Sequence, residues 1–229
     1  MVKTWATLWV VLGGLCASCA EAGSVDLPLQ IGGAYSVPAK SLKEARFSAM
    51  IRQQFDFSCG SAALSTLLTF HYRFPVTEQQ VFEEMYSRGE QEKIKQEGFS
   101  LLDMKRYLEA HGFEADGFEA PLEKLAGAAI PAIVLINDNG YNHFVVVKGL
   151  RDGRVLIGDP SGGTRALTKE KFESIWVNQI LFIISNRQEL ARFNQASDWR
   201  VAVQAPMGSG VNREGLGYLV IPKLGSSDF

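Results

Sequence analysis

The stretch QQFDFSCGSAALSTLLTFHY, residues 53–72, joins a short polar and aromatic approach to a run of small and apolar residues. From Ser58 onward the apolar residues recur at spacings of three and four, which predicts a helix that ends before Pro75. Cys59 then lies in the first turn. Unpaired backbone N–H groups and the positive end of the helix dipole lower the pKa of a thiol placed there. The stretch therefore predicts a nucleophilic cysteine at a helix N-terminus.

The first residues predict export. Residues 1–22 hold one lysine, an apolar run and then small residues, as in a signal peptide cleaved after Ala20 or two residues later. The apolar run is shorter than the ~20 residues that a retained membrane anchor needs. Lipidation of Cys19 is disfavoured because Cys16 stands where a lipoprotein signal would have leucine. Removal of this segment would leave Cys59 as the one cysteine of three, which indicates a reactive thiol or, alternatively, a small buried hydrophobe.

The composition is that of an ordinary globular protein. The 229 residues are 46% hydrophobic and 21% charged, with a net charge of -2 and both signs mixed along the chain. No basic face indicates a nucleic-acid partner. The longest later apolar run, residues 128–136, is only strand-sized, so we expect no membrane span in the mature chain.

Helical signals dominate the first half. Thr77 begins a second helix, with Gln80 three residues later as in a capping box. The charged stretch 89–98 is bounded by glycines, and we interpret it as an exposed loop or a frayed helix end. Ser100 caps a third helix, which Gly112 closes.

The second half changes to the periodicity of strands. Its β-branched, apolar runs are residues 132–136, 143–147, 155–157 and 180–184. Short turns between such runs favour antiparallel pairing. One helix, capped by Thr168, crosses before the last run. Helices packed on an antiparallel sheet make an α+β domain.

This pattern divides the chain into four parts. They are a signal peptide at 1–22, an extended N-terminal segment at 23–50, the α+β domain at 51–186 and a C-terminal extension at 187–229. The extension is polar and glycine-rich, with VAVQAP and GYLVIP as candidate short strands.

A thiol nucleophile needs a base, and the chain has three histidines. His71 is twelve residues from Cys59 on the same predicted helix, ~18 Å away, which is too far to share a proton. His111 sits at a helix C-terminus, where a cation is favoured for electrostatic reasons. His143 instead opens the strand HFVVV beside a loop, a place where catalytic side chains are often held. His143 is therefore the candidate base.

Asp159 is the candidate that orients His143. It ends the next strand, sixteen residues on, and a hairpin brings both strand ends to one edge of the sheet. A carboxylate there can accept the second ring N–H of the imidazole, although turn chemistry alone also explains an Asp-Pro-Ser-Gly-Gly sequence. Asp152 lies in the turn at the opposite end, and Asn142 and Asp138 are fallback candidates.

Acyl transfer also needs donors for the oxyanion. The Cys59 backbone N–H is one, and the side chain of Gln53 is the candidate for the second, with Gln54 as runner-up. One mature cysteine and three scattered histidines do not make a ligand spacing, so we expect neither a metal nor a cofactor.

Together these pieces resemble the C39 peptidases, papain-like cysteine proteases best known as the double-glycine leader peptidase domains of bacteriocin exporters. The resemblance covers residues 52–185 and implies a papain-like fold. It also implies that Cys59 is the nucleophile, His143 the general base and acid, Asp159 the orienting group and Gln53 an oxyanion donor.

The resemblance further implies an exported, periplasmic endopeptidase that cuts after small residues such as Gly-Gly, in a protein of an amyloid or peptide export pathway. The chain has its own LQIGGAYS, so self-processing after Gly33 is a hypothesis. Ser58 departs from the aspartate that many members carry at that position. Two alternatives stay open: a peptide-binding module that does not cleave, and an amidase or transpeptidase acting on cell-wall peptides.

Overall fold

The computed structural model describes residues 24–29, 33–38 and 41–201. The predicted signal peptide and the two candidate strands of the C-terminal extension lie almost wholly outside these residues. The chain forms two units, Met1–Ser41 and Leu42–Phe229. In the first, β1 (Ser24–Leu29) pairs antiparallel with β2 (Gly33–Pro38).

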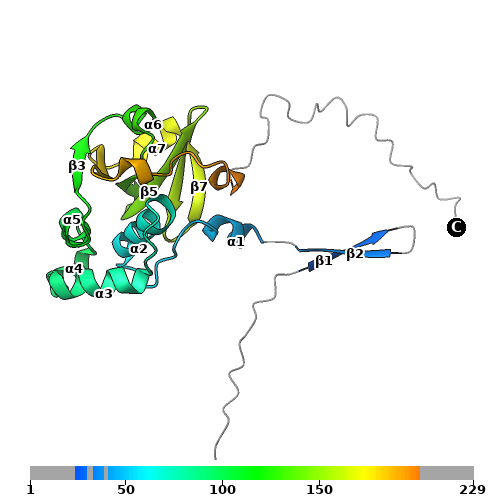
Figure 1. Ribbon diagram of the computed structural model, residues 1–229, viewed down its shortest axis with the longest axis horizontal. Coiled ribbons are helices and arrows are strands. Elements are labelled where there is room, and N and C mark those ends of the chain that lie inside the picture. The colour runs from blue at the N-terminus through cyan, green and yellow to red at the C-terminus, as the bar shows by residue number, and fades with distance from the viewer. Residues whose placement is uncertain (1–23, 30–32, 39–40, 202–229) are drawn as a thin grey trace, which may run out of the picture. The chain divides into compact units, whose positions relative to one another are not determined.

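The second unit is built on a six-stranded antiparallel sheet (Figure 1). Its order is β3-β8-β4-β5-β6-β7. The strands are β3 (Ala115–Glu119), β4 (Ala132–Asp138), β5 (Tyr141–Arg151), β6 (Arg154–Asp159), β7 (Gly163–Thr168) and β8 (Ile180–Ile184). The predicted antiparallel pairing is confirmed.

Helices precede and interrupt the sheet (Figure 1). They are α1 (Leu42–Phe47), α2 (Cys59–Thr66), α3 (Glu78–Arg88), α4 (Gln91–Glu97), α5 (Leu101–Ala110), α6 (Glu123–Ala128) and α7 (Lys169–Ile175). A π-helical turn, η1 (Leu67–His71), extends α2, and short 3₁₀ turns η2 (Gln188–Leu190) and η3 (Asp198–Val201) follow the sheet. Within the described ranges, no helix is long and apolar enough to cross a membrane.

The core lies on both faces of the sheet, because successive residues of a strand point to opposite sides. Along β5, Phe144 and Val146 join one buried cluster with α2, α3 and α5. Val145 and Val147 join a second cluster with residues of α6 and α7. In Figure 1, α6 and α7 lie at the opposite end of the unit from α3 and α4. The all-apolar run of β5 thus reflects burial on two faces.

The predicted helix caps are confirmed. Thr77 and Gln80 form the reciprocal capping box of α3, and Ser100 forms one with Asp103 at the start of α5. Gly112, with φ of +76°, follows α5 as predicted. Each box satisfies backbone donors that a helix start leaves without partners.

Two helices were not predicted as elements of their own. Residues 89–98, interpreted as a loop or a frayed helix end, contain α4, which is anchored by Ile94. Ile94 is 2% exposed, and the other residues of α4 are good helix formers. The segment predicted as extended contains α1, whose sequence LKEARF is likewise rich in helix-forming residues.

Candidate active site

The nucleophile candidate opens a buried helix. Cys59 is the first residue of α2, and every residue of that helix is buried. Ser58 does not cap the helix with its side chain; its Oγ accepts from the Phe55 N–H and donates to the Phe55 carbonyl, which closes the turn before Cys59. A Cβ at Gly60 would lie 3.0 Å from the Cβ of Phe99, so glycine permits the helix start to pack closely there.

The structure brings His143 and Asp159 together. His143 Nε2 lies 3.2 Å from Asp159 Oδ2, and both side chains are 5% exposed. A carboxylate can only accept, so Nε2 carries the proton and donates it. The other ring nitrogen, Nδ1, is buried and has no hydrogen-bond partner within the described residues. In the neutral imidazole the nitrogen without a proton is therefore Nδ1.

Cys59 lines the same cavity as this imidazole. Cys59, Asn142, His143 and Phe144 all contribute to the lining of this cavity, whose volume is about 350 Å³. The backbone N–H of Phe144, the residue after His143, is close enough to lower the pKa of the Cys59 thiol. A thiol and an imidazole with an unused nitrogen thus face one cavity, as nucleophilic catalysis requires.

The pKa of Cys59 differs from the expectation that a helix N-terminus lowers it. Burial raises the pKa of Cys59, and the backbone N–H groups of Phe144, Gly60 and Cys59 itself lower it by less, so the net shift is upward. A helix N-terminus alone therefore does not produce a thiolate in this buried site. Formation of a thiolate at Cys59 therefore requires a base, and His143 is the candidate for it.

Asp159 is held as an anion. Burial alone would raise its pKa, but hydrogen bonds from His143 and Ser161 hold the pKa well below its usual range. Its Oδ1 accepts from the Ser161 N–H at 2.9 Å, the Ser161 Oγ at 2.7 Å and the Gly162 N–H at 3.2 Å. The Asp-Pro-Ser-Gly-Gly turn therefore fixes one oxygen and leaves Oδ2 for other donors.

The loop before Cys59 places Gln53 next to Asp159. The Gln53 backbone N–H donates to the carbonyl of Pro160 at 3.2 Å, and its side-chain Nε2 donates to the carbonyl of Phe55 at 3.2 Å. Gln53 is not among the residues that line the cavity, and Gln54 is exposed. An oxyanion role for Gln53 remains a prediction that requires its side chain to turn towards the cavity.

Two residues near His143 were not singled out from the sequence. Tyr141 stacks on the imidazole with ring centroids 5.4 Å apart, and its hydroxyl donates to the carbonyl of Asp56 at 2.8 Å. Arg165 Nη2 donates to Asp159 Oδ2 and to Asp138 Oδ2. An aromatic two residues before the candidate base was a usable signal for Tyr141, whereas no local pattern marks Arg165.

The fallback candidates do not replace Asp159. Asn142 accepts from Asn137 Nδ2 at 2.6 Å. Asp138 is connected to Asp159 through the guanidinium of Arg165. Asp152 lies in the turn between β5 and β6, with φ of +52°.

The other histidines have structural partners. His71 is buried, donates from Nδ1 to the carbonyl of Arg192 at 2.5 Å, and has a pKa lowered to about 4 by burial and by Lys148. His111 stacks on Tyr107 and donates from Nδ1 to the Tyr107 carbonyl at 2.8 Å. Neither lines the cavity that holds Cys59.

The rest of the cavity lining comes from α4, α5 and the residues that join them. It includes Ile94, Leu102 and Phe99, together with charged residues of both signs such as Lys93 and Glu97. The lining therefore combines apolar and charged side chains, as ligand-binding sites commonly do.

Residues 48–188, more than half of the chain, match the Peptidase C39 family. The chain belongs to the C39 peptidases. This peptidase is 38% identical to the "Probable functional amyloid protease FapD" of Pseudomonas fluorescens over 180 residues, 78% of each chain. It is also 38% identical to the protein of that name from Pseudomonas aeruginosa over 165 residues, 72% of this chain and 73% of the relative.

The fold is also found in a solved structure. The peptidase domain of Streptococcus ComA, a bifunctional ABC transporter involved in quorum sensing, superposes with a TM-score of 0.50 at 22% identity. The match covers 60% of this chain and 97% of that domain. The C39 peptidase described here is thus a cysteine peptidase of the papain-like α+β fold.

Proposed function

We propose that this C39 peptidase is an exported endopeptidase that cleaves after small residues, such as Gly-Gly, in a protein of a functional-amyloid secretion pathway. The observation that carries the proposal is the buried His143–Asp159 pair, whose imidazole lines one cavity with Cys59. The name shared by the two Pseudomonas relatives supports the class of substrate. The pattern of residues 1–22 supports export to the periplasm.

Each residue of the site has one task in this mechanism. His143 Nδ1 takes the thiol proton, and the sulfur of Cys59 attacks the carbonyl carbon of the scissile bond. The Cys59 backbone N–H and the side chain of Gln53 donate to the oxyanion. His143 then gives its proton to the leaving amine, and later activates the water that hydrolyses the thioester. Asp159 keeps the imidazole in the required tautomer.

The two alternative functions are less well supported. A module that only binds peptides would not need a buried carboxylate to orient a histidine beside a thiol, yet the site keeps all three groups. An amidase or transpeptidase of the cell wall could use the same three groups, but the relatives are named as proteases of a functional amyloid.

Acyl-enzyme trapping tests the proposal directly. The mature protein is incubated with peptides that carry Gly-Gly followed by a small residue, and with matched peptides that carry Leu-Leu. We expect cleavage after Gly-Gly, a thioester on Cys59 detected by mass after acid quenching, and no product with Cys59→Ala. Transfer of a cell-wall peptide to Cys59, with no cleavage of the Gly-Gly peptide, would contradict the proposal.

A further inference from the structure

Asp159 Oδ2 is shared by two donors. His143 Nε2 and Arg165 Nη2 each lie 3.2 Å from this oxygen. The same Nη2 donates to Asp138 Oδ2 at 2.9 Å. The orienting carboxylate is therefore one end of a carboxylate–guanidinium–carboxylate bridge.

Four neighbouring strands supply this bridge and the imidazole. Asp138 ends β4, His143 lies near the start of β5, Asp159 ends β6 and Arg165 lies in β7, two residues beyond Gly163, the β7 partner of Asp159. Because β4, β5, β6 and β7 are adjacent in the sheet, the arginine side chain reaches across the strand that carries His143. The arrangement is set by strand order rather than by a local turn.

We propose that Arg165 and Asp138 are positioning residues that set the charge and the direction of Asp159 towards His143. The inference rests on the proposed catalytic roles of Cys59 and His143. Oδ1 of Asp159 is already occupied by Ser161 and Gly162, so Oδ2 alone serves the imidazole.

The charges of the bridge give Arg165 and Asp138 separate effects on Asp159. Arg165 alone would neutralise Asp159 and remove the negative charge that stabilises an imidazolium. Asp138 shares the guanidinium, so the three groups keep a net charge of about -1 beside His143. Arg165 and Asp138 are 32% and 24% exposed, so solvent weakens their effect without removing it.

The groups around His143 come from several elements. Asp159 on β6 and the stacked ring of Tyr141 on β5 contact the imidazole, and Arg165 on β7 and Asp138 on β4 are linked to it through Asp159. Cys59 and the charged residues Glu90, Lys93, Glu97, Asp103 and Arg106 line the cavity that His143 also lines, and the substitutions below leave all of them unchanged. Removing the positive charge of Arg165 stabilises the imidazolium, and removing the negative charge of Asp138 destabilises it. The two changes must therefore act in opposite directions.

The test is the rate of Cys59 alkylation by iodoacetate as a function of pH, which can be measured without knowing the substrate. Iodoacetate is an anion, so a protonated His143 favours its reaction. The alkaline limb of the profile is the fall in rate as the imidazolium loses its proton. We expect Arg165→Met to move the alkaline limb of the profile upwards by about half a pH unit, and Asp138→Asn to move it downwards by a similar amount. The double variant should return to the wild-type position, and Arg165→Lys, which keeps the charge, should stay there.

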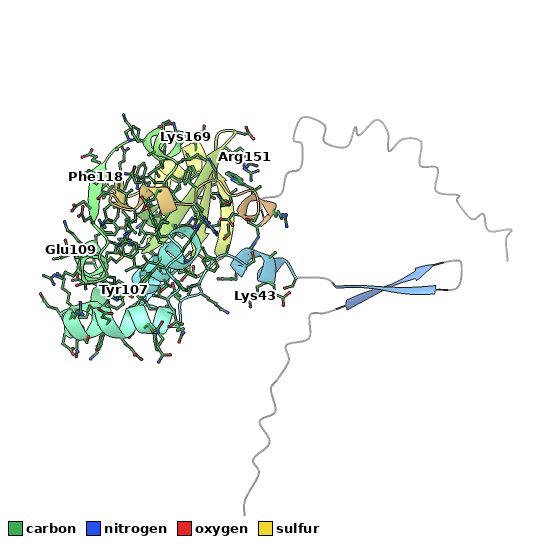
Figure 2. All side chains as sticks on the ribbon, viewed as in Figure 1. Lys43, Tyr107, Glu109, Phe118, Arg151 and Lys169 are labelled. Atoms are coloured by element: carbon green, nitrogen blue, oxygen red, sulfur yellow. The ribbon has the colours of Figure 1, made fainter. Side chains whose placement is uncertain are left out.

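Matched controls are available on the same sheet. Arg151 lies on β5 (Figure 2), and Asp152 follows it in the turn to β6. The Arg151 guanidinium lies over the ring of Trp199, 5.0 Å from its centroid. Arg151→Met and Asp152→Asn make the same changes of charge away from His143 and should leave the limb in place. If Arg165→Met is unstable by thermal unfolding, Asp138→Asn and Arg165→Lys still decide the outcome.

Two failures are distinguishable. In the first, the wild-type profile has an alkaline limb that His143→Ala abolishes, but Arg165→Met and Asp138→Asn shift that limb in the same direction, or by no more than the controls do. The inference is then wrong and the proposed function stands. If the wild-type protein has no limb that depends on His143, the proposed function fails, and the inference fails with it.

Discussion

His143 donates from Nε2 to Asp159 Oδ2 across 3.2 Å, in a contact where both side chains are 5% exposed. This contact assigns a proton to Nε2 and leaves Nδ1 as the ring nitrogen available to the thiol. Since burial raises the pKa of Cys59, the proposed mechanism requires the imidazole to act as a base before the sulfur attacks. The reactivity of the Cys59 thiol is therefore predicted to depend on His143 and Asp159.

The loss of peptidase activity should depend on which residue replaces Asp159. Asp159→Ala removes the acceptor for His143, and we expect kcat/KM to fall on the order of 10²- to 10³-fold. Asp159→Asn keeps an acceptor oxygen, as in the Cys-His-Asn arrangement of other papain-like proteases, and should lose only about tenfold. Steady-state kinetics on a Gly-Gly peptide measure both values. Equal losses in the two variants would mean that orientation is not the task of Asp159.

Asp159 should also make stability depend on pH. Its pKa is lowered in the folded protein, so its contribution to the free energy of unfolding is present above the ordinary aspartate pKa and is lost as the pH falls below about 4. Urea unfolding of wild type and Asp159→Asn at several pH values measures this. We expect the wild-type advantage to be full at pH 7 and to shrink towards pH 3. An advantage that stayed constant over that range would rule out the anionic state as its source.

Tyr141 should help to position His143 relative to the loop that precedes Cys59. Tyr141→Phe removes the hydrogen bond to the Asp56 carbonyl, and we expect alkylation of Cys59 to slow about threefold to tenfold. Tyr141→Ala also removes the stacking on His143 and should slow it further.

The control for Tyr141 is Phe118→Ala. Phe118 lies on β3, at the outer edge of the sheet (Figure 2). It is 48% exposed, close to the 50% of Tyr141. Loss of this aromatic should leave the alkylation rate unchanged. A rate for Tyr141→Ala that equals that of Phe118→Ala would count against a positioning role.

A buried ion pair should hold the start of the C-terminal extension. Lys148 Nζ lies 3.0 Å from Asp198 Oδ2 and donates to the carbonyl of Ala49 at 2.8 Å, with Lys148 fully buried. Asp198→Ala leaves a buried charge without its partner, and we expect a loss of about 3–5 kcal/mol in the free energy of unfolding. Urea denaturation measures this loss, and Lys148→Met combined with Asp198→Leu should recover much of it. A loss below ~1 kcal/mol in the single variant would show that solvent reaches the ammonium group.

Self-processing stays a separate hypothesis. The bond after Gly33 lies at the start of β2, in the unit that precedes the catalytic one. The intact mass of the purified protein, compared with that of Cys59→Ala, reports whether the chain cuts itself there. A wild-type mass in which Gly33 and Ala34 are still joined would dispose of the hypothesis.

The parts of the site that follow from local sequence were predictable. Cys59 at a helix start and His143 with Asp159 at one sheet edge follow from helix periodicity and from hairpin pairing, which fixes where strand ends meet. The contacts of Arg165 were not predictable, because β7 is half polar and the partners, Asp159 on β6 and Asp138 on β4, are brought together only by the strand order. The helix α4 was missed because a single buried residue, Ile94, anchors it, which is too little to create a periodic signal.

The most direct test of the account is the rate of Cys59 alkylation by iodoacetate as a function of pH, in wild type and in His143→Ala. The account predicts rapid labelling near neutral pH that His143→Ala abolishes, because the imidazole takes the thiol proton. Labelling that rises only as an ordinary thiol ionises, near pH 8.5 or above, and that is indifferent to His143, would contradict it.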